Sequence, residues 1–221
     1  FTKISQFQNK QIYLYRQNEI NFILNTEPGN FASQFAKSHG PSISSTGFKF
    51  KNAEFAYKKA LERGARPYKG SDAEKGGTPF LAIYGIGDSL IYFMDEKNTQ
   101  ELYSKYLPVK SENKKVVGMG FTIVDHFTNN VPVGQMQKWC DFYKQIFNFR
   151  ETMYFDIRGK QTSLISKVMR SPCGKFAVPI NEPGDSKSQI QEYLDEYKGS
   201  GIQHLALLTP DIMKTLETLK S

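Results

Sequence analysis

Residues 121–128 read Phe-Thr-Ile-Val-Asp-His-Phe-Thr, a run of β-branched and aromatic residues typical of a strand, predicted at about 120–128. A helix and three strands are predicted after it, at about 134–148, 151–157, 161–169 and 175–181. A second run, Gly-Ile-Gln-His-Leu-Ala-Leu-Leu at 201–208, begins the same order again, after a helix at about 187–197. The order strand, helix, three strands is therefore a repeated module.

The first half contains a similar unit at about 46–94, preceded by two strands within 11–24 that turn at Gln17-Asn18. Its predicted elements are a strand at 46–50, a helix at 52–63 and strands at 79–85 and 89–94. Tandem βαβββ modules predict an α+β fold of curved mixed sheets with outer helices and a cleft between paired modules.

The charged stretch 108–115 has no hydrophobic periodicity and predicts the domain boundary. We therefore expect an N-terminal domain at 1–108, a linker at 109–117 and a C-terminal domain at 118–221. The chain starts at Phe1 without a Met, and its last amphipathic segment, from about Asp211, runs into Ser221. Both domains are therefore expected to be incomplete.

Composition excludes several classes of protein. The chain carries 29 Lys+Arg against 22 Asp+Glu, but its lysines are scattered, so no nucleic-acid partner is predicted. No run approaches the roughly 20 apolar residues of a membrane span. The only cysteines, Cys140 and Cys173, cannot form a disulfide scaffold, which favours a reduced, cytoplasmic compartment. Cys140 is expected to pack on a helix face and Cys173 to lie in a turn.

The three histidines are the candidate metal ligands. His126 and His204 occupy matching places on the first strands of two modules, whereas His39 lies in a predicted loop and is expected to be structural. Two imidazoles and one carboxylate on one face of a metal leave three positions open, an arrangement that suits non-haem Fe(II). The alternative is that each histidine is an ordinary core residue of its strand.

Pleat alternation makes a prediction about which residues share a face with each histidine. We expect His126 to share its face with Val124 and Thr128 and His204 to share its face with Ile202 and Ala206. A pseudo-two-fold pairing of the modules would then bring the two imidazoles together inside the cleft. The same alternation directs Asp125 away from coordination.

Further motifs resemble the 4-hydroxyphenylpyruvate dioxygenase family over almost the whole chain, in order. In the second half they lie at 124–131, 139, 142–143, 155–159, 166–169, 171–174, 179–183, 188–191 and 201–206. In the first half they lie at 14–22, 39–41 and 85–87.

The resemblance implies the vicinal-oxygen-chelate fold and an N-terminal scaffold domain without metal. It implies a C-terminal catalytic domain that binds Fe(II) through His126, His204 and a Glu. No Glu in this sequence matches that third ligand, Glu182 included, so we expect it beyond Ser221. The implied enzyme converts 4-hydroxyphenylpyruvate and O2 to homogentisate and CO2 in tyrosine and phenylalanine catabolism. The family commonly forms dimers or tetramers, so a homo-oligomer is expected.

The resemblance also implies five substrate-binding positions, Ser166, Pro179, Asn181, Gln189 and Gln203. Each has a simpler alternative. Ser166 could be an ordinary strand hydroxyl, Asn181 could end its strand, and Pro179 could mark an edge strand. Gln189 could complete a capping box with Ser186. For Gln203, pleat alternation points the side chain to the face opposite His204.

Two other functions remain open. A relative that forms hydroxymandelate would use the same metal and substrate but oxidise the side chain. A metal-free binding module on the same fold would keep neither iron nor turnover.

Overall fold

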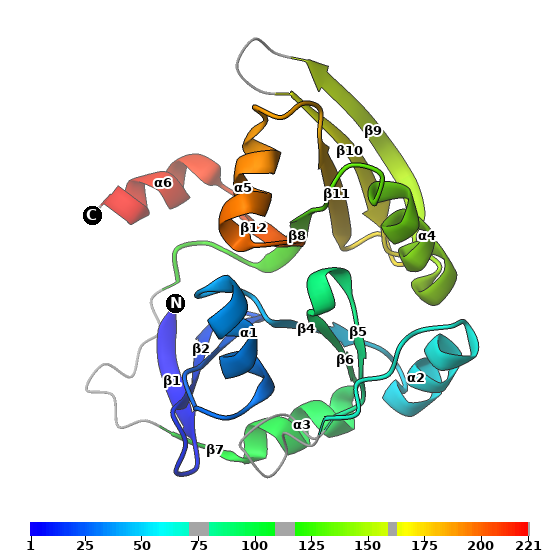
Figure 1. The fold of residues 1–221 in the computed structure, drawn as a ribbon. Coiled ribbons are helices and arrows are strands. Elements are labelled where there is room, and N and C mark those ends of the chain that lie inside the picture. The colour runs from blue at the N-terminus through cyan, green and yellow to red at the C-terminus, as the bar shows by residue number, and fades with distance from the viewer. Residues whose placement is uncertain (71–79, 109–117, 159–162, 221) are drawn as a thin grey trace.

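The computed structural model describes residues 1–70, 80–108, 118–158 and 163–220 (Figure 1). The predicted linker at 109–117 and part of the predicted turn at 158–160 lie outside these residues.

The second half contains one complete βαβββ module. Its five-stranded sheet has the order β12-β8-β11-β10-β9. The strands are β8 (Ile123–Asn130), β9 (Arg150–Arg158), β10 (Ser163–Arg170), β11 (Ala177–Pro183) and β12 (Gly201–Leu208). Strands β8 and β11 pair in parallel and the other neighbours are antiparallel. The predicted order of elements is confirmed. Because β11 lies between β8 and β10, the edge-strand alternative for Pro179 is wrong.

Helix α4 (Met136–Phe147) covers one face of this sheet. Its apolar stripe, which includes Cys140 and Tyr143, packs in one core cluster with Val178 and Ile180 of β11. Helices α5 (Gln189–Tyr197) and α6 (Ile212–Lys220) precede and follow β12. The predicted helices are thus present, with ends shifted by at most two residues.

The first half repeats the module in shorter form. Strands β4 (Ser45–Lys49), β5 (Ala82–Tyr84) and β6 (Leu90–Met94) form a sheet of order β4-β6-β5. Strand β4 pairs with β6 in parallel, β5 pairs with β6 antiparallel, and Pro67 bridges to Ile83. This is the pairing of β8, β11 and β10, with α2 (Ala53–Glu62) in the place of α4. The predicted repeat is confirmed.

Most of the other elements of the first half were not predicted. Strands β1 (Thr2–Phe7), β2 (Ile12–Gln17), β3 (Ile20–Asn25) and β7 (Tyr106–Pro108) form a sheet of order β3-β2-β1-β7. Of these, only β2 and β3 were expected. Helices α1 (Phe31–His39) and α3 (Glu96–Ser104) and the short 3-10 turn η2 (Ile86–Asp88) complete the half.

The two halves lie against each other (Figure 1) and share one core. Ile83 and Phe93 belong to the same buried cluster as Phe127 and Met169. A second link joins α1 to α5: the ring of His39 stacks on Tyr197, with centroids 4.4 Å apart. His39 is the last residue of α1, so its predicted loop position is wrong, while its contacts agree with a structural role.

Candidate metal centre

The imidazoles of His126 and His204 lie together, on the neighbouring strands β8 and β12. Their ring centroids are 5.8 Å apart and their planes cross at 77°. In the antiparallel register, His126 is opposite Ala206 and His204 is opposite Thr128. Residues directly opposite each other share a face of the sheet, so both imidazoles lie on one face. The predicted convergence of the two rings is observed.

Two β-bulges break the ladder beside these histidines. The register shifts between Ile202 and His204, which leaves Gln203 as an extra residue on β12. It shifts again between Ala206 and Leu207, which leaves Asp125 as an extra residue on β8. A bulge re-aims the side chains on either side of it. Each extra residue immediately precedes a histidine.

Because of the bulges, two of the four residues that were predicted to share a face with a histidine lie on the opposite face of the sheet. Thr128 shares the face of His126 and Ala206 shares the face of His204, as predicted. Val124 and Ile202 lie on the opposite face, because the extra residue cancels one step of pleat alternation. The objection that alternation directs Gln203 away from His204 fails for the same reason.

Each histidine Nδ1 meets an oxygen of the residue before it. Asp125 Oδ2 lies 2.7 Å from Nδ1 of His126. Gln203 Oε1 lies 3.1 Å from Nδ1 of His204, and Thr128 Oγ1 lies 3.0 Å from its Nε2. Burial lowers the pKa of His204, and the neighbouring His126 lowers it further. A neutral imidazole is the form that binds a metal ion.

Within residues 1–70, 80–108, 118–158 and 163–220 the structure holds no group of three His, Cys, Asp or Glu side chains that could bind a metal. The carboxylate of Glu182 is engaged in a different contact. Glu182 is 8% exposed, and its Oε1 accepts a hydrogen bond of 2.6 Å from the backbone N–H of Met136, at the first turn of α4. Among the described residues, no third ligand therefore joins the two imidazoles.

A row of buried polar side chains crosses the same face of the sheet. Ser166, Asn181 and Asn130 stand opposite one another on β10, β11 and β8, and none is more than 7% exposed. Asn181 Nδ2 donates to Asn130 Oδ1 over 3.3 Å. The Nδ2 of Asn130 is buried and has no partner among the described residues. A donor without a partner costs free energy, so it suits a position that receives a ligand oxygen.

Sequence reasoning missed Asn130 as a member of this row. Its position four residues after His126 could have identified it, because residues an even number of positions apart lie on the same side of a regular strand.

Of the remaining predicted positions, Pro179 lies on the face of the sheet that carries the histidines, and Gln189 lies on the protein surface. Pro179 alternates with Asn181 on β11 and so shares its face. Gln189 is the first residue of α5 and is exposed. The N-cap of α5 is Ser188, whose side chain accepts from the backbone N–H of Ile190, so the capping box between Ser186 and Gln189 is wrong.

The two cysteines are free and lie as expected. Cys140 is fully buried on α4, and burial raises the pKa of its thiol to about 11. Cys173 is exposed in the turn after β10, and a hydrogen bond with Ser171 lowers its pKa.

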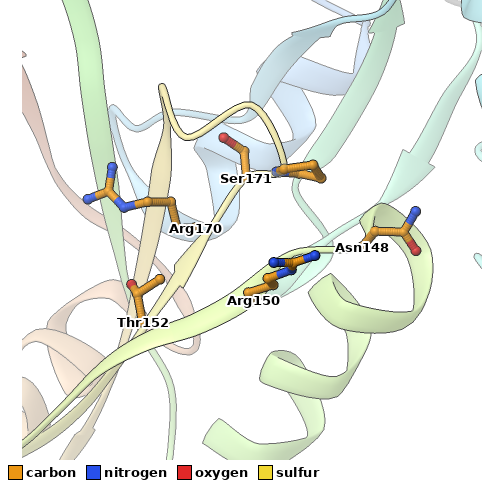
Figure 2. A pocket seen from close by; sticks show the side chains of 6 residues that line it. Asn148, Arg150, Thr152, Arg170 and Ser171 are labelled. Carbon is orange, nitrogen blue, oxygen red and sulfur yellow. The ribbon is translucent and has the colours of Figure 1, made fainter.

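One surface hollow lies away from the histidines (Figure 2). It measures about 670 Å³, and Asn148, Arg150, Thr152, Arg170, Ser171 and Pro172 line it. Arg150 and Arg170 are cross-strand neighbours, but their guanidinium groups point in different directions in Figure 2 and form no joint anion clamp. We therefore place the candidate site at the histidine pair and not at this hollow.

Known proteins resemble both halves of the chain. Residues 1–106 match the family model described as hydroxyphenylpyruvate dioxygenase, N-terminal. Residues 123–221 match the glyoxalase/bleomycin resistance protein/dioxygenase superfamily. No described helix is long and apolar enough to cross a membrane.

Among curated relatives, the protein MelA of Shewanella colwelliana is 48% identical over all of this chain, which covers 63% of MelA. A 4-hydroxyphenylpyruvate dioxygenase of Pseudomonas aeruginosa is 43% identical over the whole chain, which covers 62% of that protein. The chain thus spans less than two thirds of these relatives.

A solved structure of a xylose isomerase-like TIM barrel/4-hydroxyphenylpyruvate dioxygenase fusion protein aligns with a TM-score of 0.80 and 27% identity. The alignment covers 99% of this chain and 34% of that protein.

Paired βαβββ modules with polar groups gathered on one face of the sheet define the class: the chain has the vicinal-oxygen-chelate fold of the glyoxalase/dioxygenase superfamily. Within that superfamily, the chain resembles 4-hydroxyphenylpyruvate dioxygenase over its whole length.

Proposed function

We propose that the protein carrying this chain is an Fe(II)-dependent dioxygenase that converts 4-hydroxyphenylpyruvate and O2 to homogentisate and CO2. The observation that carries the proposal is the meeting of His126 and His204, 5.8 Å apart between ring centroids, on one face of the sheet. Imidazole nitrogen is a good donor for Fe(II), and two such donors with one carboxylate form the facial set of non-haem oxygenases. The donors present fit the metal.

His126 and His204 hold the metal in this proposal, and a Glu expected beyond Ser221 completes the set. Fe(II), when bound, supplies the activation of O2 that decarboxylates the 2-oxo acid and hydroxylates its ring. The chain's own residues bind and orient the substrate. The buried row of Ser166, Asn181 and Asn130 offers it hydrogen-bond donors and acceptors beside the two histidines.

Pro179 shapes the slot for the ring, and Gln189 and Gln203 are the remaining substrate-binding positions. Gln203 is well placed because its bulge brings its amide oxygen to the imidazole of His204. Gln189 is the weaker assignment, because it is exposed at the start of α5.

We propose a division into a metal-free scaffold domain at 1–108 and a catalytic domain at 118–221, joined at 109–117. We also propose that the protein acts in the cytoplasm as a homo-oligomer, dimer or tetramer, in tyrosine and phenylalanine breakdown.

The test supplies the whole protein with Fe(II), a reductant and 4-hydroxyphenylpyruvate and identifies the product formed as O2 is consumed. Homogentisate is the expected product. Hydroxymandelate would assign the protein to side-chain oxidation instead. Absence of both iron retention and O2 uptake by the whole protein would contradict both activities and favour a binding module.

A further inference from the structure

The residues that precede the two histidines share an unusual placement. Asp125 and Gln203 are each the extra residue of a β-bulge, one on β8 and one on β12. On a regular strand, a residue and its successor point to opposite faces. The bulges remove that restriction, so each of these side chains reaches the ring that follows it.

The contacts of His126 and His204 indicate which of the two ring nitrogens carries the proton in each imidazole. The carboxylate of Asp125 can only accept a hydrogen bond, so the Nδ1 of His126 that faces it must donate. The amide oxygen of Gln203 is likewise an acceptor and faces Nδ1 of His204. The hydroxyl of Thr128 then donates to Nε2 of His204, which agrees with a proton on Nδ1.

We propose that Asp125 and Gln203 are positioning residues: each holds the imidazole that follows it in the Nδ1–H form, which leaves both Nε2 atoms unprotonated. In the metal-free chain the hydroxyl of Thr128 occupies the lone pair of His204 Nε2, and a metal ion would take its place. The inference depends on the proposed function only for the identity of the ion that those nitrogens bind. Loss of an outer partner of a ligating histidine commonly weakens metal affinity about 10–100-fold.

The experiment uses the metal-free chain with ¹⁵N only in its histidine rings. The chain contains three histidines, so a long-range ¹H–¹⁵N correlation spectrum resolves every ring. The spectra are recorded at about pH 8, above the pKa of about 6.5 of histidine in a model peptide. His39 is an internal reference: its Nδ1 lies 2.7 Å from the backbone carbonyl of Tyr197, which can only accept.

We expect His126 and His204 to show the Nδ1–H pattern of His39, although imidazole in water favours Nε2–H. Asp125→Ala should return His126 alone to the solution preference, and Gln203→Ala should do so for His204 alone. Asp125→Asn keeps an amide oxygen at the same place and should preserve the Nδ1–H form. An unchanged His39 signal shows that each variant is folded.

Thr128→Val is the matched control, because it removes the Nε2 contact of His204 and leaves Gln203 in place. It should not change the tautomer. Two results would overturn the inference: an Nε2–H form of both rings in the unaltered chain, or a tautomer that survives Gln203→Ala and is lost in Thr128→Val.

A calorimetric titration of the whole protein with Co(II) separates this inference from the proposed function. Asp125→Ala should weaken binding about 10–100-fold. Complete absence of Co(II) binding by the unaltered protein, with both rings in the Nδ1–H form, would contradict the proposed metal site and leave the positioning role supported.

Discussion

At the scale of single residues, the three histidines have three different environments. His39 stacks on Tyr197 and joins α1 to α5, whereas His126 and His204 face each other across β8 and β12. The meeting of the last two could be predicted, because they hold matching places in a repeated module. Their exact neighbours could not, because the bulges depend on hydrogen bonding between strands that lie far apart in the chain.

His126→Ala and His204→Ala should each remove most of the iron that the whole protein retains, because two imidazoles provide most of the proposed ligand set. The measurement is iron per chain after anaerobic reconstitution and desalting. His39→Gln is the matched control, since an amide can still donate to the carbonyl of Tyr197. Normal iron content in either alanine variant would remove that histidine from the ligand set.

The two thiols should react very differently with iodoacetamide at about pH 8, since the thiolate is the nucleophile. Cys173 is exposed with a lowered pKa, so it should be labelled readily, and faster as the pH rises. Cys140 is buried and its pKa is raised to about 11, so it stays protonated and protected. Peptide mass spectrometry reads both sites, and unfolding in urea should abolish the difference.

At the scale of elements, strand and helix order follows from local pattern, whereas the capping of α4 does not. Periodicity predicted α4 from its apolar stripe, and the observed helix covers Met136–Phe147. The side chain that contacts its first turn comes from Glu182, which is 46 residues further along the chain than Met136. No local spacing rule reveals such a partner. The elements α1 and β1 were missed; they are short, nine and six residues.

Glu182→Ala should lower the free energy of unfolding by about 1–2 kcal/mol, because it removes a buried carboxylate that accepts from a helix N-terminus. Chemical denaturation followed by circular dichroism measures the change. Glu196→Ala, at an exposed position of α5, should change the stability by less than about 0.5 kcal/mol. Equal effects of the two substitutions would contradict the capping role.

At the scale of the whole molecule, the first half supports the strand that carries His204. Gly87, in η2, has a φ of +62°, and a Cβ added there would clash with the carbonyl oxygen of Ser200, just before β12. The halves thus touch backbone to backbone next to the site, in addition to sharing a core. Sequence alone does not reveal this contact, which requires both halves to be folded.

Gly87→Ala should therefore destabilise the chain by about 1–3 kcal/mol more than a glycine substitution that introduces backbone strain alone. Gly29→Ala is that control: its φ is +81°, and nothing lies within 4 Å of the added Cβ. Thermal unfolding of both variants gives the comparison. Similar losses of stability would mean that the backbone at Ser200 moves away at little cost.

The bulge at Gln203 also affects how the sheet would respond to the deletion of one residue. Ile202 pairs with Asn129 and His204 with Thr128, so two consecutive positions of β8 face three of β12. Removal of the Gln203 codon would leave every remaining pair in register, with His204 still on the side of His126. A deletion there would remove the amide beside His204 without shifting the pairing of β8 and β12.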